Sequence, residues 1–133
     1  MAVLSDPISD FLTRLKNASR AGKDTFTAPF SKMKAEVARI LAEEGYIWNF
    51  EIKKDGKFPE IQVKVKYDDK GIPALTDLKK MSKPGLRQYV GAGEVPRVLS
   101  GLGITIVSTS KGLMTGAAAS RKNVGGELIA KVW

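Results

Sequence analysis

Apolar residues repeat at a spacing of three to four in two segments near the start of the chain. The first segment runs from Asp6 to Arg20 and contains Ile8, Phe11, Leu12 and Leu15. Ser5 or Asp6 can cap its start, and Pro7 suits the first helical position. The second segment runs from Ser31 to Glu44 and contains Met33, Val37, Ile40 and Leu41. The pattern predicts two amphipathic helices, the second capped by Ser31 and ended by Gly45.

Between and after these segments the pattern changes to the two-residue alternation of strands. Thr25–Pro29 alternates only briefly, which predicts a short edge strand. Apolar positions in Ile47–Ile52 and in Ile61–Val65 flank Lys54–Lys57, whose Asp-Gly pair is a hairpin turn signal. We therefore expect a β-hairpin packed on the two helices.

A cluster of charges and helix breakers from Asp68 to Pro73 ends this first periodic region. It is the best candidate for a linker between two small domains. We expect an N-terminal α/β domain over residues 1–67, a linker over 68–73 and a C-terminal β-rich domain over 74–133. The predicted fold class is α/β in the α+β sense, with a helix-strand-helix-hairpin unit followed by a β-rich unit with short helices.

The second half of the chain contains most of the glycines and only short apolar runs, which indicates turn-rich β structure. It begins with two apolar runs, Leu75–Met81 and Leu86–Val90, which are separated by a turn at Pro84-Gly85. One or two helical turns are expected at Glu94–Ser100, followed by a strand at Ile104–Val107 that leads into Ser108–Gly112. Thr115 can cap a short Ala-rich segment that ends near Lys122, and Leu128–Val132 is the closing strand.

Positive charge is concentrated in the same half. The chain has 22 Lys and Arg against 14 Asp and Glu, a net charge of +8. Division at Tyr67 leaves +3 before the cut and +5 after it, and beyond Met81 only Glu94 and Glu127 are acidic. A surface of this kind attracts polyanions, so RNA, DNA and anionic membranes are the candidate partners. If one half binds a polyanion, we expect it to be the second.

Several classes of protein are disfavoured by what the sequence lacks. It has no cysteine and no histidine, which removes thiolate chemistry and the commonest general base and metal ligand. It contains no phosphate-binding loop, Gly101-Leu102-Gly103 lacks the rest of a dinucleotide fingerprint, and no acidic cluster has metal spacing. We therefore expect no cofactor and no metal. No apolar run approaches the roughly 20 residues of a membrane span, and a cytoplasmic location follows by default.

The segment Ser108-Thr109-Ser110-Lys111-Gly112 allows three interpretations. Its Ser-x-x-Lys spacing occurs in some serine acyl-enzymes, although that mechanism places the serine at the start of a helix in a much larger fold. The three hydroxyls can instead contact RNA 2′-hydroxyls, phosphates and base edges, with Lys111 as a phosphate contact and Gly112 permitting close approach. The structural alternative is that these hydroxyls satisfy backbone groups of a turn.

Further candidates lie on both sides of this segment. Tyr89 follows Arg87 on a turn-flanked strand, where its ring could stack on an unpaired base or belong to the core. Glu127 is nearly alone among cations and could accept from base amino groups or hold a basic residue. Arg14 shares a helix with acidic residues, so a solvated face is its default interpretation. Lys32 and Lys34 occupy a helix start that an anionic partner would favour.

At full length the chain resembles the bacterial form of the eighth protein of the small ribosomal subunit. The matching segments are Asp6-Pro7-Ile8, Leu12-Thr13-Arg14 with Asn17, Ser31–Lys34, Glu43–Ile47, Ser82–Arg87 with Tyr89, Gly101–Ile104, Val107–Thr115 and Gly125-Gly126-Glu127. The run Val107–Thr115 is the most specific of them. Gly116 stands where the family often has an acidic residue, and the residues after it depart from the usual pattern, so contacts of that helix are not carried over.

The resemblance implies a structural constituent of the small ribosomal subunit that binds the central domain of its RNA and helps to assemble the platform. In that family the Ser-Thr-Ser loop, the tyrosine and the glutamate contact an irregular RNA helix, which assigns Ser108, Thr109, Ser110, Tyr89 and Glu127. Arg14, Lys32 and Lys34 inherit contacts to further RNA. Implied partners are small-subunit proteins five and twelve and, for a regulatory role, the messenger RNA of its own operon. Such a messenger-RNA regulator is the main alternative function, and an enzyme is the third.

Overall fold

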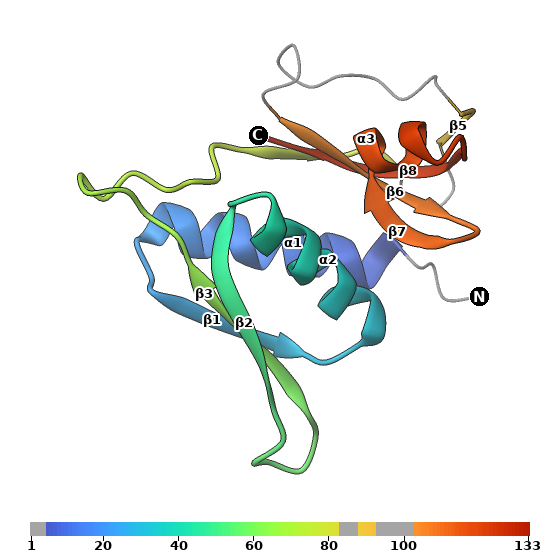
Figure 1. The fold of residues 1–133 in the computed structure, drawn as a ribbon. Coiled ribbons are helices and arrows are strands. Elements are labelled where there is room, and N and C mark those ends of the chain that lie inside the picture. Colours follow the sequence, from blue (N-terminus) through green and yellow to red (C-terminus); the bar gives the residue numbers. More distant parts are fainter. Residues whose placement is uncertain (1–4, 83–87, 93–102) are drawn as a thin grey trace. The chain divides into compact units, whose positions relative to one another are not determined.

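The computed structural model describes residues 5–82, 88–92 and 103–133 (Figure 1). The described elements are α1 (Ser5–Ala21), β1 (Thr25–Pro29), α2 (Lys32–Glu43), β2 (Ile47–Lys53), β3 (Glu60–Val65), β4 (Leu78–Lys80), β5 (Tyr89–Val90), β6 (Ile104–Thr109), β7 (Gly112–Thr115), α3 (Gly116–Arg121) and β8 (Gly126–Val132). They confirm the predicted mixed class, with a helix-strand-helix-hairpin unit followed by a β-rich unit. The described chain divides into Pro7–Thr76 and a unit that contains Asp77–Trp133.

The two predicted helices of the first unit are confirmed, together with the faces that they bury. Ile8, Phe11, Leu12 and Leu15 of α1 are fully buried, as the three-to-four spacing requires. The Ser31 side chain caps α2 by accepting a hydrogen bond from the backbone N–H of Lys34. After α2, Gly45 adopts a φ of 85°, a left-handed conformation that glycine adopts without a Cβ penalty.

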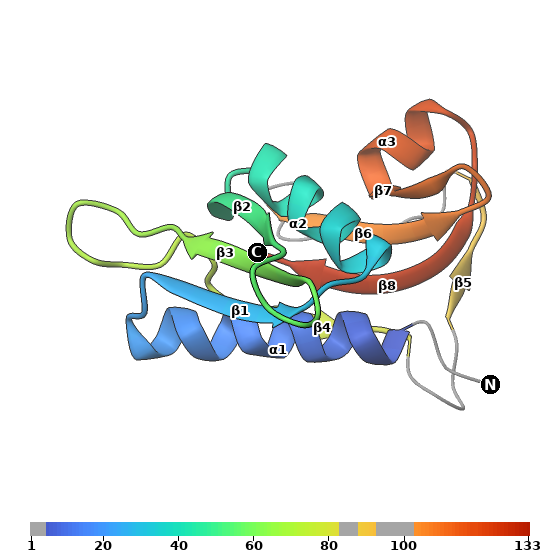
Figure 2. The ribbon, with the colours of Figure 1, turned by 90° about the horizontal axis from the view of Figure 1, so that it is seen from below.

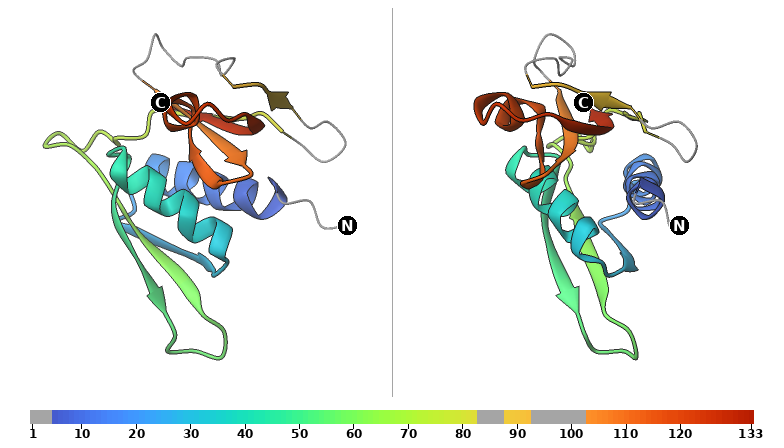
Figure 3. Two further views of the ribbon diagram at one scale, coloured as in Figure 1. Left: turned by 45° about the vertical axis from the view of Figure 1, so that its right-hand side comes forward. Right: turned by 90° about the vertical axis from the view of Figure 1, so that its right-hand side faces the viewer.

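The three strands of this unit form an antiparallel sheet of order β1-β3-β2. The predicted hairpin is therefore confirmed as β2–β3, and β1 is an edge strand as expected. Both helices lie against one face of this sheet (Figures 1 and 3), where Ala28, Ile61, Val63 and Val65 are buried. The opposite face carries the intervening polar residues, including Thr27 and Lys64. Helix spacing and strand alternation thus meet in one core.

The segment predicted as a linker forms an ordered turn after β3. Asp68 accepts hydrogen bonds through Oδ1 from the backbone N–H groups of Lys70 and Ile72, and its own N–H donates to the Ile72 carbonyl. Pro73 forms a β-bridge with Tyr67. This turn belongs to the first compact unit. The limits 1–67, 68–73 and 74–133 concern independent domains and remain a prediction.

The second unit is built on a five-stranded antiparallel sheet. Its order is β4-β8-β6-β7, and β5 also pairs with β8. The closing strand β8 begins two residues earlier than the prediction, at Gly126, and β6 extends two residues further, to Thr109. The short helix α3 contacts β6 and β7 (Figure 2), and Thr115 caps it by accepting from the N–H of Ala118 as predicted.

One strand of this sheet was not predicted. β7 consists of Gly112-Leu113-Met114-Thr115, which pairs with β6 to form a hairpin. Ser108 and Thr109 therefore lie within a strand rather than in a loop after it. The predicted Pro84-Gly85 turn and the helical turns at Glu94–Ser100 lie outside the described residues. No helix in the described ranges is both long and apolar enough to cross a membrane.

Candidate nucleic-acid interface

Three of the predicted site residues lie in one row across adjacent strands of the second unit. Glu127 in β8 is directly opposite Tyr89 in β5 on one side and Ser108 in β6 on the other. Directly opposed residues of antiparallel strands place their side chains on the same face of the sheet, with Cβ atoms about 5 Å apart. Residues that are far apart in the sequence are therefore neighbours on one surface.

The side chains of this row differ in how much of each is exposed to solvent. The Tyr89 side chain is 71% exposed and Ser108 is half-buried, whereas Glu127 is only 9% exposed. Next in the row beyond Ser108 is Leu113, which is buried. The row thus presents an aromatic ring to solvent at one end, beside a recessed carboxylate and a hydroxyl.

The β6–β7 turn places the remaining residues of the predicted loop next to this row. Thr109 and Gly112 are paired, with Ser110 and Lys111 exposed between them. Gly112 has a φ of 107°, whereas neither Ser110 nor Lys111 has a positive φ. This combination fits a type I turn followed by a glycine bulge. Gly112 is therefore required by the backbone of the turn, in addition to any role in close approach.

The three hydroxyls of this segment are used differently. The Thr109 hydroxyl donates to the Gly112 carbonyl (2.8 Å) and accepts from the Lys111 backbone N–H (3.0 Å). For Thr109 the turn-stabilising interpretation therefore describes the observed contacts. The hydroxyls of Ser108 and Ser110 form no hydrogen bond with another described residue. These two hydroxyls are the ones available to a ligand.

Two glycines at the start of β8 allow the strands of the row to approach one another. A Cβ on Gly126 would overlap the carbonyl oxygen of Ser108 and lie 2.9 Å from its carbonyl carbon. A Cβ on Gly125 would overlap the carbonyl oxygen of Val90. In the sequence these glycines stood out only as part of the family resemblance. Two adjacent glycines, separated from the predicted strand Leu128–Val132 by Glu127 alone, were the signal for a close backbone approach.

A second feature that the sequence analysis missed holds β5 in the sheet. Ser82 is fully buried, and its hydroxyl accepts from the Gln88 backbone N–H (2.9 Å) and lies 3.3 Å from the Gln88 carbonyl oxygen. The Gln88 side chain donates to the Met81 carbonyl, and the Gln88 carbonyl accepts from the Leu128 N–H. These contacts position the residue before Tyr89. Arg87, another predicted site residue, lies outside the described residues.

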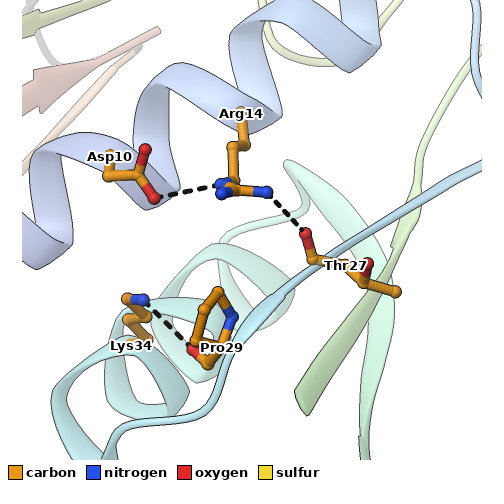
Figure 4. Close-up of polar contacts among 5 residues, drawn as sticks. All are labelled: Asp10, Arg14, Thr27, Pro29 and Lys34. Atoms are coloured by element: carbon orange, nitrogen blue, oxygen red, sulfur yellow. Dashed lines mark hydrogen bonds and ion pairs between the residues drawn. The ribbon is translucent and has the colours of Figure 1, made fainter.

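The predicted cationic residues of the first unit are placed differently from one another (Figure 4). Arg14 pairs with Asp10 (3.0 Å), and its guanidinium also donates to the Thr27 carbonyl. Lys34 is buried and its ammonium donates to the Pro29 carbonyl (3.1 Å), so it joins α2 to β1. Lys32 is exposed. Arg14 and Lys32 remain accessible, whereas the Lys34 charge is directed into a contact within the unit.

The geometry also bears on the other chemistries that were considered. Ser108 lies in the middle of a sheet and Lys111 in a turn, an arrangement unlike the helix start that a Ser-x-x-Lys nucleophile occupies. In the ranges that the structure describes, no group of three or more Asp and Glu residues is arranged to hold a metal ion. What the arrangement offers is hydrogen bonding, one exposed ring and positive charge.

Comparison with known proteins finds matches along nearly the whole chain. A family model described as ribosomal protein S8 matches residues 6–133. The small ribosomal subunit protein uS8 of Syntrophobacter fumaroxidans is 52% identical over 133 residues, which is all of both chains. The protein of the same name from Lachnoclostridium phytofermentans is 52% identical over 131 residues, and that from Clostridioides difficile is 48% identical over 130 residues, each covering 98% of both chains.

Proposed function

The chain belongs to the ribosomal protein S8 family and is a non-enzymatic structural constituent of the small subunit of the cytoplasmic ribosome, and on this premise we propose that it binds ribosomal RNA directly through the row Tyr89–Glu127–Ser108. The proposed target is an irregular helix in the central domain of the small-subunit RNA. The observation that carries the proposal is the side-by-side placement, on one sheet face, of an exposed ring, a carboxylate and a hydroxyl that bonds no other described residue.

Each member of the row offers a contact that an irregular RNA helix can use. The exposed Tyr89 ring can stack on a base or sugar that is not paired. The recessed Glu127 carboxylate accepts hydrogen bonds, and the amino groups of cytosine and guanine are donors that become fully accessible where bases are unpaired. The Ser108 hydroxyl both donates and accepts, so it can meet a 2′-hydroxyl. Together these contacts favour RNA with unstacked bases over a regular duplex.

The β6–β7 turn extends this surface with smaller groups. Ser110 adds a second hydroxyl, Lys111 adds a point charge for one phosphate, and Gly112 keeps the backbone accessible. Thr109 holds the turn in shape, so its contribution to binding is the positioning of Ser110 and Lys111. A rigid, small turn can fit a groove without the entropy cost of ordering long side chains.

The first unit supplies weaker candidates for additional contacts. Lys32 is exposed and can approach a phosphate, and Arg14 retains about half of its side-chain exposure beside Asp10. Lys34 is a poorer candidate, because its ammonium already donates to the Pro29 carbonyl.

Small-subunit proteins five and twelve are proposed neighbours in the assembled platform. Residues 1–67 and 74–133 are proposed to be separate domains joined by 68–73.

The test is binding of the purified chain to a short ribosomal RNA helix, with and without its internal loop. We expect tighter binding to the irregular helix, because the row contacts need unstacked bases. Ser108→Ala, Ser110→Ala and Glu127→Gln should each narrow the difference in affinity, by about tenfold for Glu127→Gln if it meets a base edge. Ser120→Ala is the matched control, since Ser120 is an exposed serine on α3.

Two outcomes would contradict the proposal. Equal affinity for both RNAs would show that binding depends on charge alone. An unchanged difference in affinity in all three variants would remove the row from the site. A parallel measurement with the messenger RNA of the chain's own operon separates the two RNA functions, because a regulator should prefer that target to the ribosomal helix.

A further inference from the structure

The β2–β3 hairpin of the first unit has an unusual surface that the proposed site does not include. Of the five large hydrophobic side chains that are exposed among the described residues, three lie on this hairpin: Trp48 is 53% exposed, Ile52 42% and Phe58 71%. Trp48 and Phe58 lie near opposite ends of the hairpin, roughly 20 Å apart along the strands. Tryptophan is usually well buried in folded proteins, so its exposure here needs an explanation.

A β-bulge accounts for the outward position of Trp48. Ile47 is opposite Val65 and Asn49 is opposite Lys64, so Trp48 is an extra residue in β2 with no partner of its own in β3. The bulge lets Trp48 and Asn49 both be exposed while Ile47 stays buried. Bulges often redirect a side chain for function. The bulge in β2 therefore exposes the Trp48 ring to solvent.

Each exposed ring lies beside a lysine of the same hairpin. The Lys66 ammonium is 4.6 Å from the centroid of the Trp48 ring, and the Lys57 ammonium is 5.6 Å from that of Phe58. Contacts at these distances are cation–π interactions, and they hold a positive charge next to an aromatic face. A ring beside a lysine thus occurs at both ends of one hairpin. This repetition argues against chance as the reason for the exposure of Trp48 and Phe58.

The charge on the hairpin favours an anionic partner. From Ile47 to Lys66 it carries five lysines and three acidic residues. One of the acids, Glu51, pairs with Lys53 at 2.9 Å. The far end and its loop extend past both helices (Figures 1 and 3). Exposed rings alternating with lysines are what nonspecific single-strand binding uses, because bases stack on the rings and phosphates meet the charges.

We propose that the β2–β3 hairpin binds unpaired RNA, with Trp48 and Phe58 as stacking platforms and Lys57, Lys64 and Lys66 as phosphate contacts. The two rings are separated along the hairpin and each is flanked by charge, which suits successive nucleotides of an extended strand. A protein interface would instead gather its apolar groups into one desolvated centre. This surface is separate from the row Tyr89–Glu127–Ser108 and does not depend on it.

Tryptophan fluorescence tests the proposal directly. The chain has two tryptophans, so Trp133→Phe leaves Trp48 as the only reporter. Titration of the full-length Trp133→Phe chain with single-stranded oligouridylate of about 12 nucleotides should quench Trp48. In a parallel assay with labelled oligouridylate, Trp48→Ala and Phe58→Ala should each weaken binding about tenfold. Trp48→Phe, which keeps a ring, should retain most of the affinity.

Controls separate this surface from the rest of the molecule. Ile72→Ala removes an apolar side chain that is 57% exposed outside the hairpin, and it should leave oligouridylate binding unchanged. Ser120→Ala, an exposed position on α3 that belongs to neither proposed surface, should also leave it unchanged. If Glu127→Gln weakens oligouridylate binding and Trp48→Ala does not, the single strand binds the other site and the hairpin proposal is wrong.

Two further results would overturn the proposal. The first is an absence of Trp48 quenching together with unchanged affinity in Trp48→Ala and Phe58→Ala. The second is binding of polyglutamate, but not of oligouridylate, that is lost in Lys66→Gln. That second result would identify an acidic protein surface as the partner of the hairpin.

Discussion

The β2–β3 and β6–β7 hairpins share a supersecondary motif and present opposite kinds of surface. In β6–β7 the strands are joined by the two exposed residues Ser110 and Lys111, and the Thr109 hydroxyl bonds both sides of the turn. In β2–β3 a six-residue connection, Lys54–Pro59, separates the strands and contains exposed lysines and an exposed ring. One connection is short and internally bonded, and the other is long and carries bulky side chains.

On the two proposals above, the two hairpins would bind RNA in different ways. Small groups on a fixed backbone select a particular RNA shape, because a displaced hydroxyl or carbonyl has no means of adjusting. Long lysines and exposed rings tolerate many sequences, because every base has a face on which a ring can stack. We therefore expect affinity at β6–β7 to depend on RNA structure, and affinity at β2–β3 to depend mainly on single-stranded character and salt.

The largest expected effect comes from the close approach of the strands that carry the row Tyr89–Glu127–Ser108. Gly126→Ala places a Cβ against the Ser108 carbonyl, which forces β6 and β8 apart. We expect a loss of about 3 kcal/mol in the free energy of unfolding, together with loss of selective RNA binding. Chemical denaturation measures the first effect and helix binding the second.

Gly56→Ala is the matched control for this change. Gly56 lies in the β2–β3 connection, its φ is not positive, and a Cβ there meets nothing within 4 Å. We expect a change in stability of at most about 0.5 kcal/mol. If Gly126→Ala and Gly56→Ala destabilise the chain equally, the close approach of β6 and β8 is not what makes Gly126 necessary.

A smaller effect should follow from loosening the β6–β7 turn itself. Thr109→Val keeps the side-chain shape and removes two hydrogen bonds, which should cost about 1–2 kcal/mol of stability. Ser110→Ala should leave stability nearly unchanged, since its hydroxyl has no partner among the described residues. Both variants should weaken binding to the irregular helix. If Thr109→Val proves as stable as the parent chain, the turn is not held by these bonds.

A further prediction concerns Tyr67, whose phenol bonds to backbone carbonyl groups of the first unit. Its phenol donates to the Lys23 carbonyl (2.6 Å) and lies 3.2 Å from the Ala18 carbonyl oxygen. Burial, and secondarily the charge of Asp24, raise the pKa of Tyr67 above its usual 10.0. Tyr67→Phe should cost about 1 kcal/mol at neutral pH. Unfolding measured by denaturant reports the difference.

The pH dependence of that difference has a defined sign. The raised pKa means that the folded state favours the protonated phenol, so its stabilisation is complete below the unfolded pKa of about 10. It is lost as the pH rises through the folded pKa. The parent chain and Tyr67→Phe should therefore converge in stability above pH 10. A constant difference across that range would show that the phenol proton is not what matters.

The smallest effect concerns single charges and the salt dependence of binding. Lys111→Gln should lower the slope of log affinity against log salt by about 0.7 to 0.9, the value for one phosphate contact. Lys34→Met should leave that slope unchanged, because the Lys34 ammonium is buried against the Pro29 carbonyl. A reduced slope in Lys34→Met would restore it as a phosphate contact.

Local elements of the fold could be predicted because neighbouring residues determine them. The spacing of Ile8, Phe11, Leu12 and Leu15 predicted α1, and the Asp55-Gly56 pair between alternating runs predicted the first hairpin. The strand β7 escaped prediction because Gly112-Leu113-Met114-Thr115 has no alternating pattern of its own. Its strand geometry comes from pairing with β6, a contact that composition does not reveal.

The candidate site, too, could be predicted only as far as neighbouring residues determine it. Ser108–Gly112, Tyr89 and Glu127 could be nominated from residue type and from the family resemblance, but residue type alone could not show that Ser108, Glu127 and Tyr89 face one another. That arrangement depends on β8 pairing with β5 and β6 at once, and on Gly125 and Gly126 allowing the approach. Lys34 shows the converse, since a promising cation in the sequence is buried in the fold.

The helices, the first hairpin, the excess of positive charge and the family resemblance along the whole chain could all be obtained from the sequence. The tertiary structure alone decided which side chains are neighbours, which hydroxyls are already bonded, and that Trp48 is exposed on a bulge. The physical reason is that periodicity and capping act within a few residues. Strand register and burial arise from contacts between segments that are distant in the chain.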